Sequence, residues 1–234
     1  MMKNSKRASL GIITGSGPEA GLDMWNKVLK ANKNLMGEAF KGDLDAPMVN
    51  IISEPLLGLS MELELHDDKV WNTLSQVANE VAQQVDYYAI ACNTLNYYQP
   101  QLEALALKSK LVSFGDVVKQ KLEQEGIKKV ALLGSDPVTD LGDWSPYRQL
   151  KEVAEVEVPD PELGLHQLIY DVKTYGGDMP FICESFTKLV DSLEADLVLL
   201  ACTELPLIPI KTHKQLIDVT DLVAQELAKL SQAL

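Results

Sequence analysis

Residues that build many common functional sites are scarce in this sequence. Its 234 residues include three histidines, which lie far apart, and only two arginines, Arg7 and Arg148. The three cysteines are Cys92, Cys183 and Cys202, and no two of them form a C-x-x-C pair. This pattern favours neither a zinc site nor a disulfide framework, so we expect no metal ion.

Clustered positive charge and long apolar runs are also absent. The formal net charge is −13 and no run of Lys and Arg occurs, which argues against a nucleic-acid partner. No segment approaches the roughly 20 apolar residues of a membrane span, so we expect no membrane contact. The basic start of the chain leads into an apolar stretch that Gly11, Gly15 and Gly17 interrupt, unlike a secretory signal. We therefore expect a cytoplasmic protein.

The sequence does contain short apolar runs that alternate with longer amphipathic stretches. Strands are predicted at residues 10–13, 48–52, 87–92, 129–134 and 196–202, and helices at 68–85, 179–195 and 218–230. Strands that are buried on both faces and alternate with helices are typical of an α/β fold with mostly parallel sheets.

Two pairs of segments also echo each other along the chain. Residues 86–95, DYYAIACNTL, align with residues 196–205, DLVLLACTEL, and in each the cysteine comes six residues after the aspartate. Upstream, GIITGS at 11–16 resembles VALLGS at 130–135. A duplicated α/β unit with altered loops would leave this pattern.

We therefore expect two pseudo-symmetric α/β domains, each with a mostly parallel sheet flanked by helices. The N-terminal half is predicted at residues 1–108, with a C-terminal helix within 209–234 that packs back onto it, and the second half at 113–208. Ligands of open α/β sheets bind beyond the carboxyl ends of the strands. The active site is accordingly expected in the cleft between the two halves.

Both repeated cysteines are predicted to end a strand and to precede a helix. A helix N-terminus presents unpaired N–H groups and the positive end of the dipole, which lower the pKa of a thiol and bind carboxylates. Asn93 and Thr94 follow Cys92, and Thr203 follows Cys202. These polar side chains are expected both to cap the helices and to bind a carboxylate.

Two such cysteines on opposite sides of a substrate carbon can act as a symmetric acid–base pair. One, as a thiolate, removes the proton from a carbon next to a carboxylate, and the other, as a thiol, delivers a proton to the opposite face. Inversion of a stereocentre needs this arrangement, because a single base tends to return the proton to the same side. Donors aimed at the developing enolate charge can each contribute about 3 kcal/mol.

Four segments resemble the signature segments of the aspartate/glutamate racemase family, especially its aspartate racemase branch. They are GIITGSGPEA, ACNTLNYY, VALLGS with the threonine that follows it, and LLACTELPLI. The resemblance runs from about residue 9 to residue 226. It implies a pseudo-symmetric two-domain α/β fold and inversion of a small amino acid or dicarboxylate without any cofactor. It also implies a homodimer.

Carried over by position, the resemblance makes Cys92 and Cys202 the catalytic acid and base. The substrate-binding residues that it implies are Ser16, Gly17, Asn93, Thr94, Ser135, Thr139, Lys173 and Thr203.

The sequence departs from the family pattern at several places, among them Gly21 and the pair Leu95-Asn96. Ser16 stands where the family usually has Met, and Lys173 comes about one residue early. Residues 53–68 contain no Arg to hold the distal carboxylate of an aspartate-like substrate. The identity of the amino acid, and the participation of Glu204 or His166, therefore stay open.

Other functions also stay open. A superfamily isomerase or decarboxylase of a small dicarboxylic acid would share the fold, although such a decarboxylation needs only one cysteine. A catalytically idle protein that binds an acidic metabolite would use the same residues. A nicotinamide cofactor is disfavoured, because the G-x-G-x-x-A match at 15–20 lacks the acidic residue expected about 20 positions later.

Overall fold

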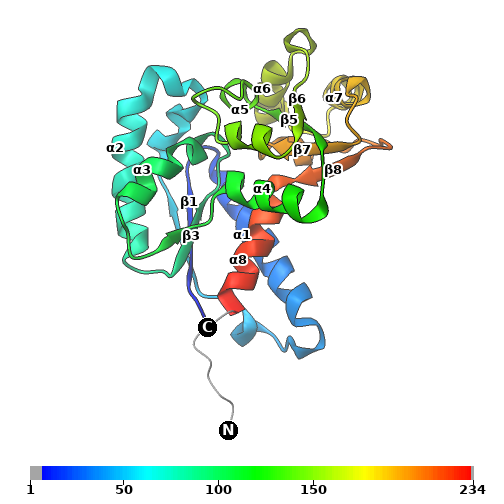
Figure 1. Cartoon of the computed structure of the whole chain (residues 1–234). Coiled ribbons are helices and arrows are strands. Elements are labelled where there is room, and N and C mark those ends of the chain that lie inside the picture. The colour runs from blue at the N-terminus through cyan, green and yellow to red at the C-terminus, as the bar shows by residue number, and fades with distance from the viewer. Residues whose placement is uncertain (1–6, 233–234) are drawn as a thin grey trace. The chain divides into compact units, whose positions relative to one another are not determined.

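The chain folds into two compact units, each of which is built from segments distant in sequence. The computed structural model describes residues 7–232 (Figure 1). The first unit consists of the chain up to Cys92, the segment Tyr98–Ser113 and the chain from Thr220 onward. The second unit consists of Asn93–Tyr97 and Phe114–Val219. The peptide bond between Cys92 and Asn93 is thus a point at which the chain leaves one unit for the other.

The first unit contains a four-stranded parallel sheet in the order β2-β1-β3-β4. Its strands are β1 (Leu10–Thr14), β2 (Val49–Ser53), β3 (Tyr87–Ile90) and β4 (Lys110–Leu111). All five residues of β1 are buried, as expected for a central strand covered on both faces. In register, Leu10 of β1 lies opposite Val49 of β2 and Tyr87 of β3.

The second unit contains a four-stranded parallel sheet with the same topology, β6-β5-β7-β8. Its strands are β5 (Lys129–Gly134), β6 (Glu155–Glu157), β7 (Leu197–Ala201) and β8 (Gln215–Asp218). Strands β1 and β5 therefore occupy equivalent positions, as do β3 and β7. The predicted fold class of two pseudo-symmetric α/β units is confirmed, and the two repeated sequence pairs fall on equivalent strands.

Helices flank both sheets. The first unit carries α1 (Pro18–Met36), α2 (Leu63–Ala82), α3 (Gln99–Ala104) and α8 (Val219–Gln232). The second unit carries α4 (Phe114–Glu125), α5 (Asp136–Thr139), α6 (Leu165–Tyr175) and α7 (Pro180–Ser192). Helix α8 lies beside α1 in Figure 1, and the Gln232 side chain donates to Asn32 of α1 at 3.1 Å.

Sequence patterning predicted the central strands but not three of the edge strands. Strands β4, β6 and β8 are short, and each carries at least one charged residue, such as Lys110, Glu155 or Asp218. An edge strand is paired on one side only and is partly exposed, so it lacks the continuous apolar run of a central strand. No helix within residues 7–232 combines the length and the apolar character that crossing a membrane requires.

The core of the second unit depends on α7, whose apolar face packs on the sheet with α6. Ile182, Phe186, Leu189 and Val190 of this helix are all buried at 1% exposure or less. Their positions, i, i+4, i+7 and i+8, place them on one face of the helix. Phe181, by contrast, is 45% exposed on the same helix.

Replacing Phe186 with alanine is expected to lower the free energy of unfolding by about 3–5 kcal/mol, because a large buried side chain leaves a cavity. Urea unfolding followed by circular dichroism measures the change. Phe181→Ala is the matched control in the same helix, and its expected effect is within about 1 kcal/mol. Equal losses for the two variants would contradict this account of the core.

Candidate active site

The parallel sheets bring the motif loops together within each unit. In the first unit, β1 leads into Gly15-Ser16-Gly17 and its neighbour β3 leads into Cys92. In the second, β5 leads into Ser135 and its neighbour β7 leads into Cys202. Since parallel strands end at the same edge of a sheet, each cysteine lies next to a loop from the adjacent strand.

Cys92 lies in a buried group of hydroxyls. Its thiol donates to Ser16 Oγ, with the sulfur 3.4 Å from the oxygen. Ser16 Oγ is 2.7 Å from Ser60 Oγ, which is itself 3.8 Å from the Cys92 sulfur. Ser16 and Cys92 are each 8% exposed and Ser60 is fully buried. These three side chains form a closed triangle of polar atoms, which we call the Cys92 triangle.

Gly15 sets the path of the loop that carries Ser16. Its φ angle is +129°, and a Cβ atom at this position would lie 2.0 Å from the carbonyl oxygen of Glu54. Only glycine fits such a contact with the backbone. Gly17 follows with φ 80° and precedes Pro18, which begins α1. The loop is therefore fixed by backbone contact on one side and by a helix start on the other.

The polar residues that follow Cys92 belong to the second unit. The Tyr147 hydroxyl donates to Asn93 Oδ1, and Thr94 Oγ1 lies 3.1 Å from Ser135 Oγ. Asn93, Thr94 and Ser135 are each at most 4% exposed. Among the described residues, Asn93 Nδ2 finds no hydrogen-bond partner although it is buried. A buried amide donor of this kind is costly, so it suits a position that receives an acceptor from a ligand.

The prediction that a helix follows each cysteine and is capped by these residues is wrong in detail. Cys92 is followed by a short 3₁₀ segment, Thr94–Tyr98, and Cys202 by an even shorter one, Leu205–Leu207. Asn93 and Thr94 direct their side chains to Tyr147 and Ser135 instead of capping a helix. Because a macrodipole needs several aligned turns, side chains rather than helix dipoles dominate the surroundings of both sulfurs.

Cys202 lies next to a carboxylate. Its thiol donates to Glu204 Oε2 at 2.9 Å, and the Thr203 hydroxyl donates to the same oxygen at 2.9 Å. Lys173 Nζ of α6 lies 3.3 Å from the other oxygen, Oε1. Burial raises the pKa of the Cys202 thiol well above its usual value, and the negative charge of Glu204 raises this pKa further, while Lys173 opposes the rise.

The structure thus groups the predicted site residues within each unit. Ser16 contacts Cys92 in the first unit, while Lys173 and Thr203 both contact the carboxylate that neighbours Cys202 in the second. Thr139 directs its hydroxyl to the backbone carbonyls of Ser135 and Asp136, at 3.3 and 3.4 Å. These are the i−4 and i−3 backbone contacts that a threonine hydroxyl commonly makes within a helical turn.

The sequence analysis did not predict two of the residues that contact the site. Ser60 and Tyr147 lie in segments without a recognisable motif, and only tertiary structure brings them to Cys92 and Asn93. Glu204, which the sequence left undecided, is the direct partner of the Cys202 thiol.

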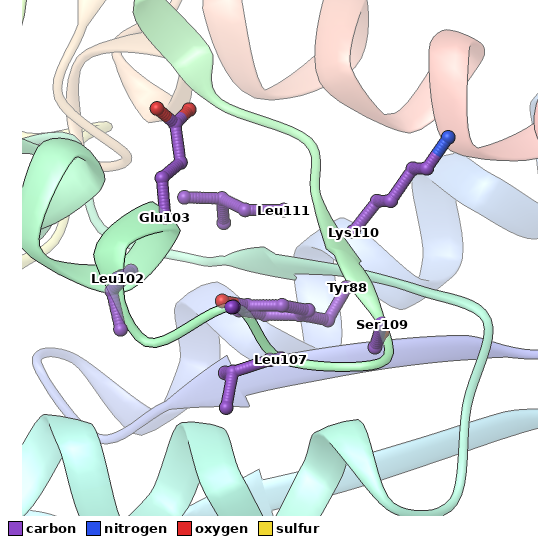
Figure 2. Close-up of a pocket in the computed structure, with 8 residues that line it drawn as sticks. Tyr88, Leu102, Glu103, Leu107, Ser109, Lys110 and Leu111 are labelled. Carbon is purple, nitrogen blue, oxygen red and sulfur yellow. The ribbon is translucent and has the colours of Figure 1, made fainter.

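A separate pocket of about 310 Å³ opens beside the edge strand β4 of the first unit (Figure 2). Figure 2 shows Leu102, Leu107 and Leu111 around the Tyr88 ring. Burial, together with the charge of Glu103, raises the pKa of the Tyr88 phenol to about 12, so the phenol stays neutral. None of the predicted site residues lines this pocket.

The two parallel α/β units share one topology, and each carries a cysteine close after the equivalent strand, β3 or β7. A family model for Asp/Glu/Hydantoin racemase matches residues 13–227 of this chain. The chain therefore belongs to the Asp/Glu/hydantoin racemase family.

Solved structures share this fold. The aspartate racemase of Picrophilus torridus aligns with a TM-score of 0.78 at 21% identity, covering 94% of this chain and 93% of its own. An aspartate racemase homologue from Pyrococcus horikoshii OT3 gives 0.75 at 22% identity, covering 96% and 99%. The glutamate racemase of Francisella tularensis in complex with D-glutamate gives 0.65 at 13% identity, covering 96% and 81%. At these identities the alignments establish the fold.

Glu204→Gln is expected to lower the pKa of the Cys202 thiol, because it removes a negative charge that disfavours the thiolate. The pKa stays above its usual value, since burial is the larger cause and remains. At a fixed pH the thiolate fraction of Cys202, and so its rate of alkylation by iodoacetamide, should rise. Mass spectrometry of the Cys202 peptide measures this rate.

Lys173→Met is the matched counterpart, because Lys173 favours the thiolate. Its loss should slow alkylation of Cys202. Rates that move in the same direction in both variants would contradict the assignment of opposite effects to Glu204 and Lys173.

Proposed function

We propose that this protein is a cofactor-independent racemase of a small acidic amino acid, in which Cys92 and Cys202 exchange protons with opposite faces of the α-carbon. The observation that carries the proposal is the equivalent position of the two cysteines. Cys92 directly follows Ala91 beyond β3, and Cys202 directly follows β7, the corresponding strand of the second sheet. Both thiols contact polar side chains, whereas the thiol of Cys183 donates to a backbone carbonyl, that of Gly177.

Cys183 provides the contrast within the same chain. It lies within α7, and it packs against the hydrophobic core of the second unit. A cysteine of this kind acts as a small apolar residue. Only Cys92 and Cys202 stand at the strand ends where α/β proteins place their reacting groups.

The partners of the two thiols differ in a way that suits one acid and one base. The carboxylate of Glu204 accepts the Cys202 S–H and disfavours a second negative charge beside it, so Cys202 rests as the thiol. The hydroxyls of Ser16 and Ser60 can donate as well as accept, so they can stabilise a thiolate at Cys92. The two sulfurs thus differ in their neighbours, with a carboxylate at Cys202 and two hydroxyls at Cys92.

Recognition of the α-carboxylate is proposed for the residues next to the sulfurs. Asn93 Nδ2 is a buried donor with no partner among the described residues, and Thr94 and Ser135 add hydroxyls beside it. A carboxylate that receives such donors also becomes easier to convert to the enolate form during proton removal. One well-placed donor to the developing charge can contribute about 3 kcal/mol.

Fewer side chains are in place to bind a second carboxylate of the substrate. Arg148 donates to the Asp143 carbonyl at 2.7 Å, and Arg7 donates to the Asp45 carbonyl. Lys173 pairs with Glu204. A distal carboxylate would therefore compete with Glu204 for Lys173, and the substrate panel below includes neutral amino acids for that reason.

The reaction as proposed needs no cofactor, because both proton transfers fall to cysteine side chains. We also propose a cytoplasmic protein that acts as a homodimer, which the family resemblance supports. Sedimentation velocity is expected to give twice the monomer mass of 25.8 kDa. A single species at the monomer mass across micromolar concentrations would overturn the dimer.

Incubation with L- and D-amino acids in heavy water, followed by proton NMR, tests the activity itself. We expect loss of the α-proton signal of an acidic amino acid together with formation of its enantiomer, measured by chiral chromatography. Cys92→Ser and Cys202→Ser should each lower racemisation by at least about 10²-fold, the lower range for removal of a general acid or base. Cys183→Ser should retain the activity.

Full turnover in either Cys92→Ser or Cys202→Ser would contradict the two-base assignment. Absence of exchange with every amino acid under reducing conditions, combined with measurable binding, would instead favour a protein that binds an acidic metabolite without turning it over. Conversion of maleate or decarboxylation of a malonate would identify another reaction of the superfamily.

A further inference from the structure

Ser60 is a fully buried polar residue with no role in the predicted site. It lies in the 3₁₀ segment Pro55–Glu62, which connects β2 to α2. Its hydroxyl contacts two atoms that the sequence did assign, Ser16 Oγ at 2.7 Å and the Cys92 sulfur at 3.8 Å. A hydroxyl held in a buried position against a proposed catalytic sulfur calls for an explanation beyond packing.

We propose that Ser60 is a positioning residue for Cys92, whose hydroxyl, together with that of Ser16, holds the sulfur in place and donates to it whenever it is ionised. This inference rests on the proposed function of Cys92 as an acid and base. It gives the 3₁₀ segment after β2 a role in positioning Cys92, although no motif in that segment predicts one.

The Cys92 triangle can serve both protonation states of the sulfur without movement of any heavy atom. When Cys92 is a thiol, its S–H donates to Ser16 Oγ, as observed at 3.4 Å, and Ser16 in turn can donate to Ser60. When Cys92 is a thiolate, rotation of the Ser16 and Ser60 hydroxyl hydrogens points both donors toward the sulfur. Neither serine loses its proton, so the transferred proton passes only between Cys92 and the substrate.

Burial makes these donors necessary. Cys92 is 8% exposed, and a buried thiolate is disfavoured unless hydrogen bonds replace the lost water. Charged residues near this segment are engaged elsewhere or exposed. Glu54 Oε1 accepts from Leu56 N at 2.9 Å, Glu62 lies 3.7 Å from His66, and Glu19 at the start of α1 is exposed. The hydroxyls of Ser16 and Ser60 are therefore neutral donors in position to stabilise charge on the sulfur.

The contrast with Cys202 supports the assignment. There the nearest polar atom is a carboxylate oxygen, which can accept from a thiol but cannot donate to a thiolate. Hydroxyls at one sulfur and a carboxylate at the other make the two sites electrostatically unequal. The Ser60 hydroxyl is one of the two donors that distinguish the surroundings of Cys92 from those of Cys202.

Carbon-13 NMR of protein labelled at cysteine Cβ tests the inference, because each thiol then reports its own titration. Cys→Ala variants assign the three signals. Ser60→Ala is expected to move the titration midpoint of Cys92 upward by about one pH unit, a tenfold change in the thiolate equilibrium. The midpoints of Cys183 and Cys202 should not move.

Ser231→Ala is the matched control. Ser231 is also a fully buried serine of the first unit, and its hydroxyl donates to the Ala228 carbonyl at 2.7 Å. This variant should leave the Cys92 midpoint unchanged. An unchanged midpoint in Ser60→Ala would overturn the inference, as would an equal shift in both serine variants, which would indicate a general structural effect.

A second measurement uses α-deuterated enantiomers of the substrate that the panel identifies. Ser60→Ala should lower kcat/KM about tenfold, and equally in both directions, because the equilibrium constant of a racemisation is one. The deuterium isotope effect on kcat/KM should rise for the enantiomer that Cys92 deprotonates and fall for the other, since only the Cys92 step slows. Isotope effects that do not change would overturn the inference.

The two experiments separate this inference from the proposed function. The NMR titration needs no substrate, so a shift of Cys92 in a protein without racemase activity would leave the Ser60 contact standing while the proposed function falls. If the protein is an active racemase but Ser60→Ala leaves the Cys92 midpoint unchanged, the proposed function stands and the proposed role of Ser60 is wrong.

Discussion

The parallel pairing of β1 with β3, and of β5 with β7, is the constraint on which the candidate site depends. Parallel strands that are neighbours in a sheet end at the same edge, so the loops that follow them meet. This pairing brings Ser16 to Cys92 in the first unit. In the second it places Ser135, whose hydroxyl contacts Thr94, beside β7, the strand that Cys202 follows.

The two units share one strand order but surround their cysteines with different side chains. The two sheets share one strand order, yet hydroxyls contact the first sulfur and a carboxylate contacts the second. A carboxylate can accept from a thiol but cannot donate to a thiolate, whereas a hydroxyl can do both, so the two sulfurs have unequal surroundings. The difference between Ser60 and Glu204 is therefore as informative about mechanism as the likeness between the two cysteine motifs.

Prediction from the sequence was most successful where neighbouring residues along the chain determine the secondary structure and burial of a residue. The buried runs of β1, β3, β5 and β7 are continuous in sequence, so their apolar character identified them. The same local pattern misjudged the segments after the cysteines. Asn93 and Thr94 are residue types that favour helix caps, but their side chains bind Tyr147 and Ser135, which lie far away in the sequence.

By itself, the sequence determined the α/β class, the internal duplication and the two cysteines that follow equivalent strands, because each of these features depends on patterns of residues that are adjacent in the sequence. Only the tertiary structure decided which side chains contact each sulfur. Ser60 is separated from Cys92 by 32 positions, and Lys173 of α6 contacts Glu204 although α7 and β7 lie between them in the sequence. Such contacts arise from strand order and loop path, and a hydrogen bond between residues far apart in the chain leaves no periodic pattern in the sequence.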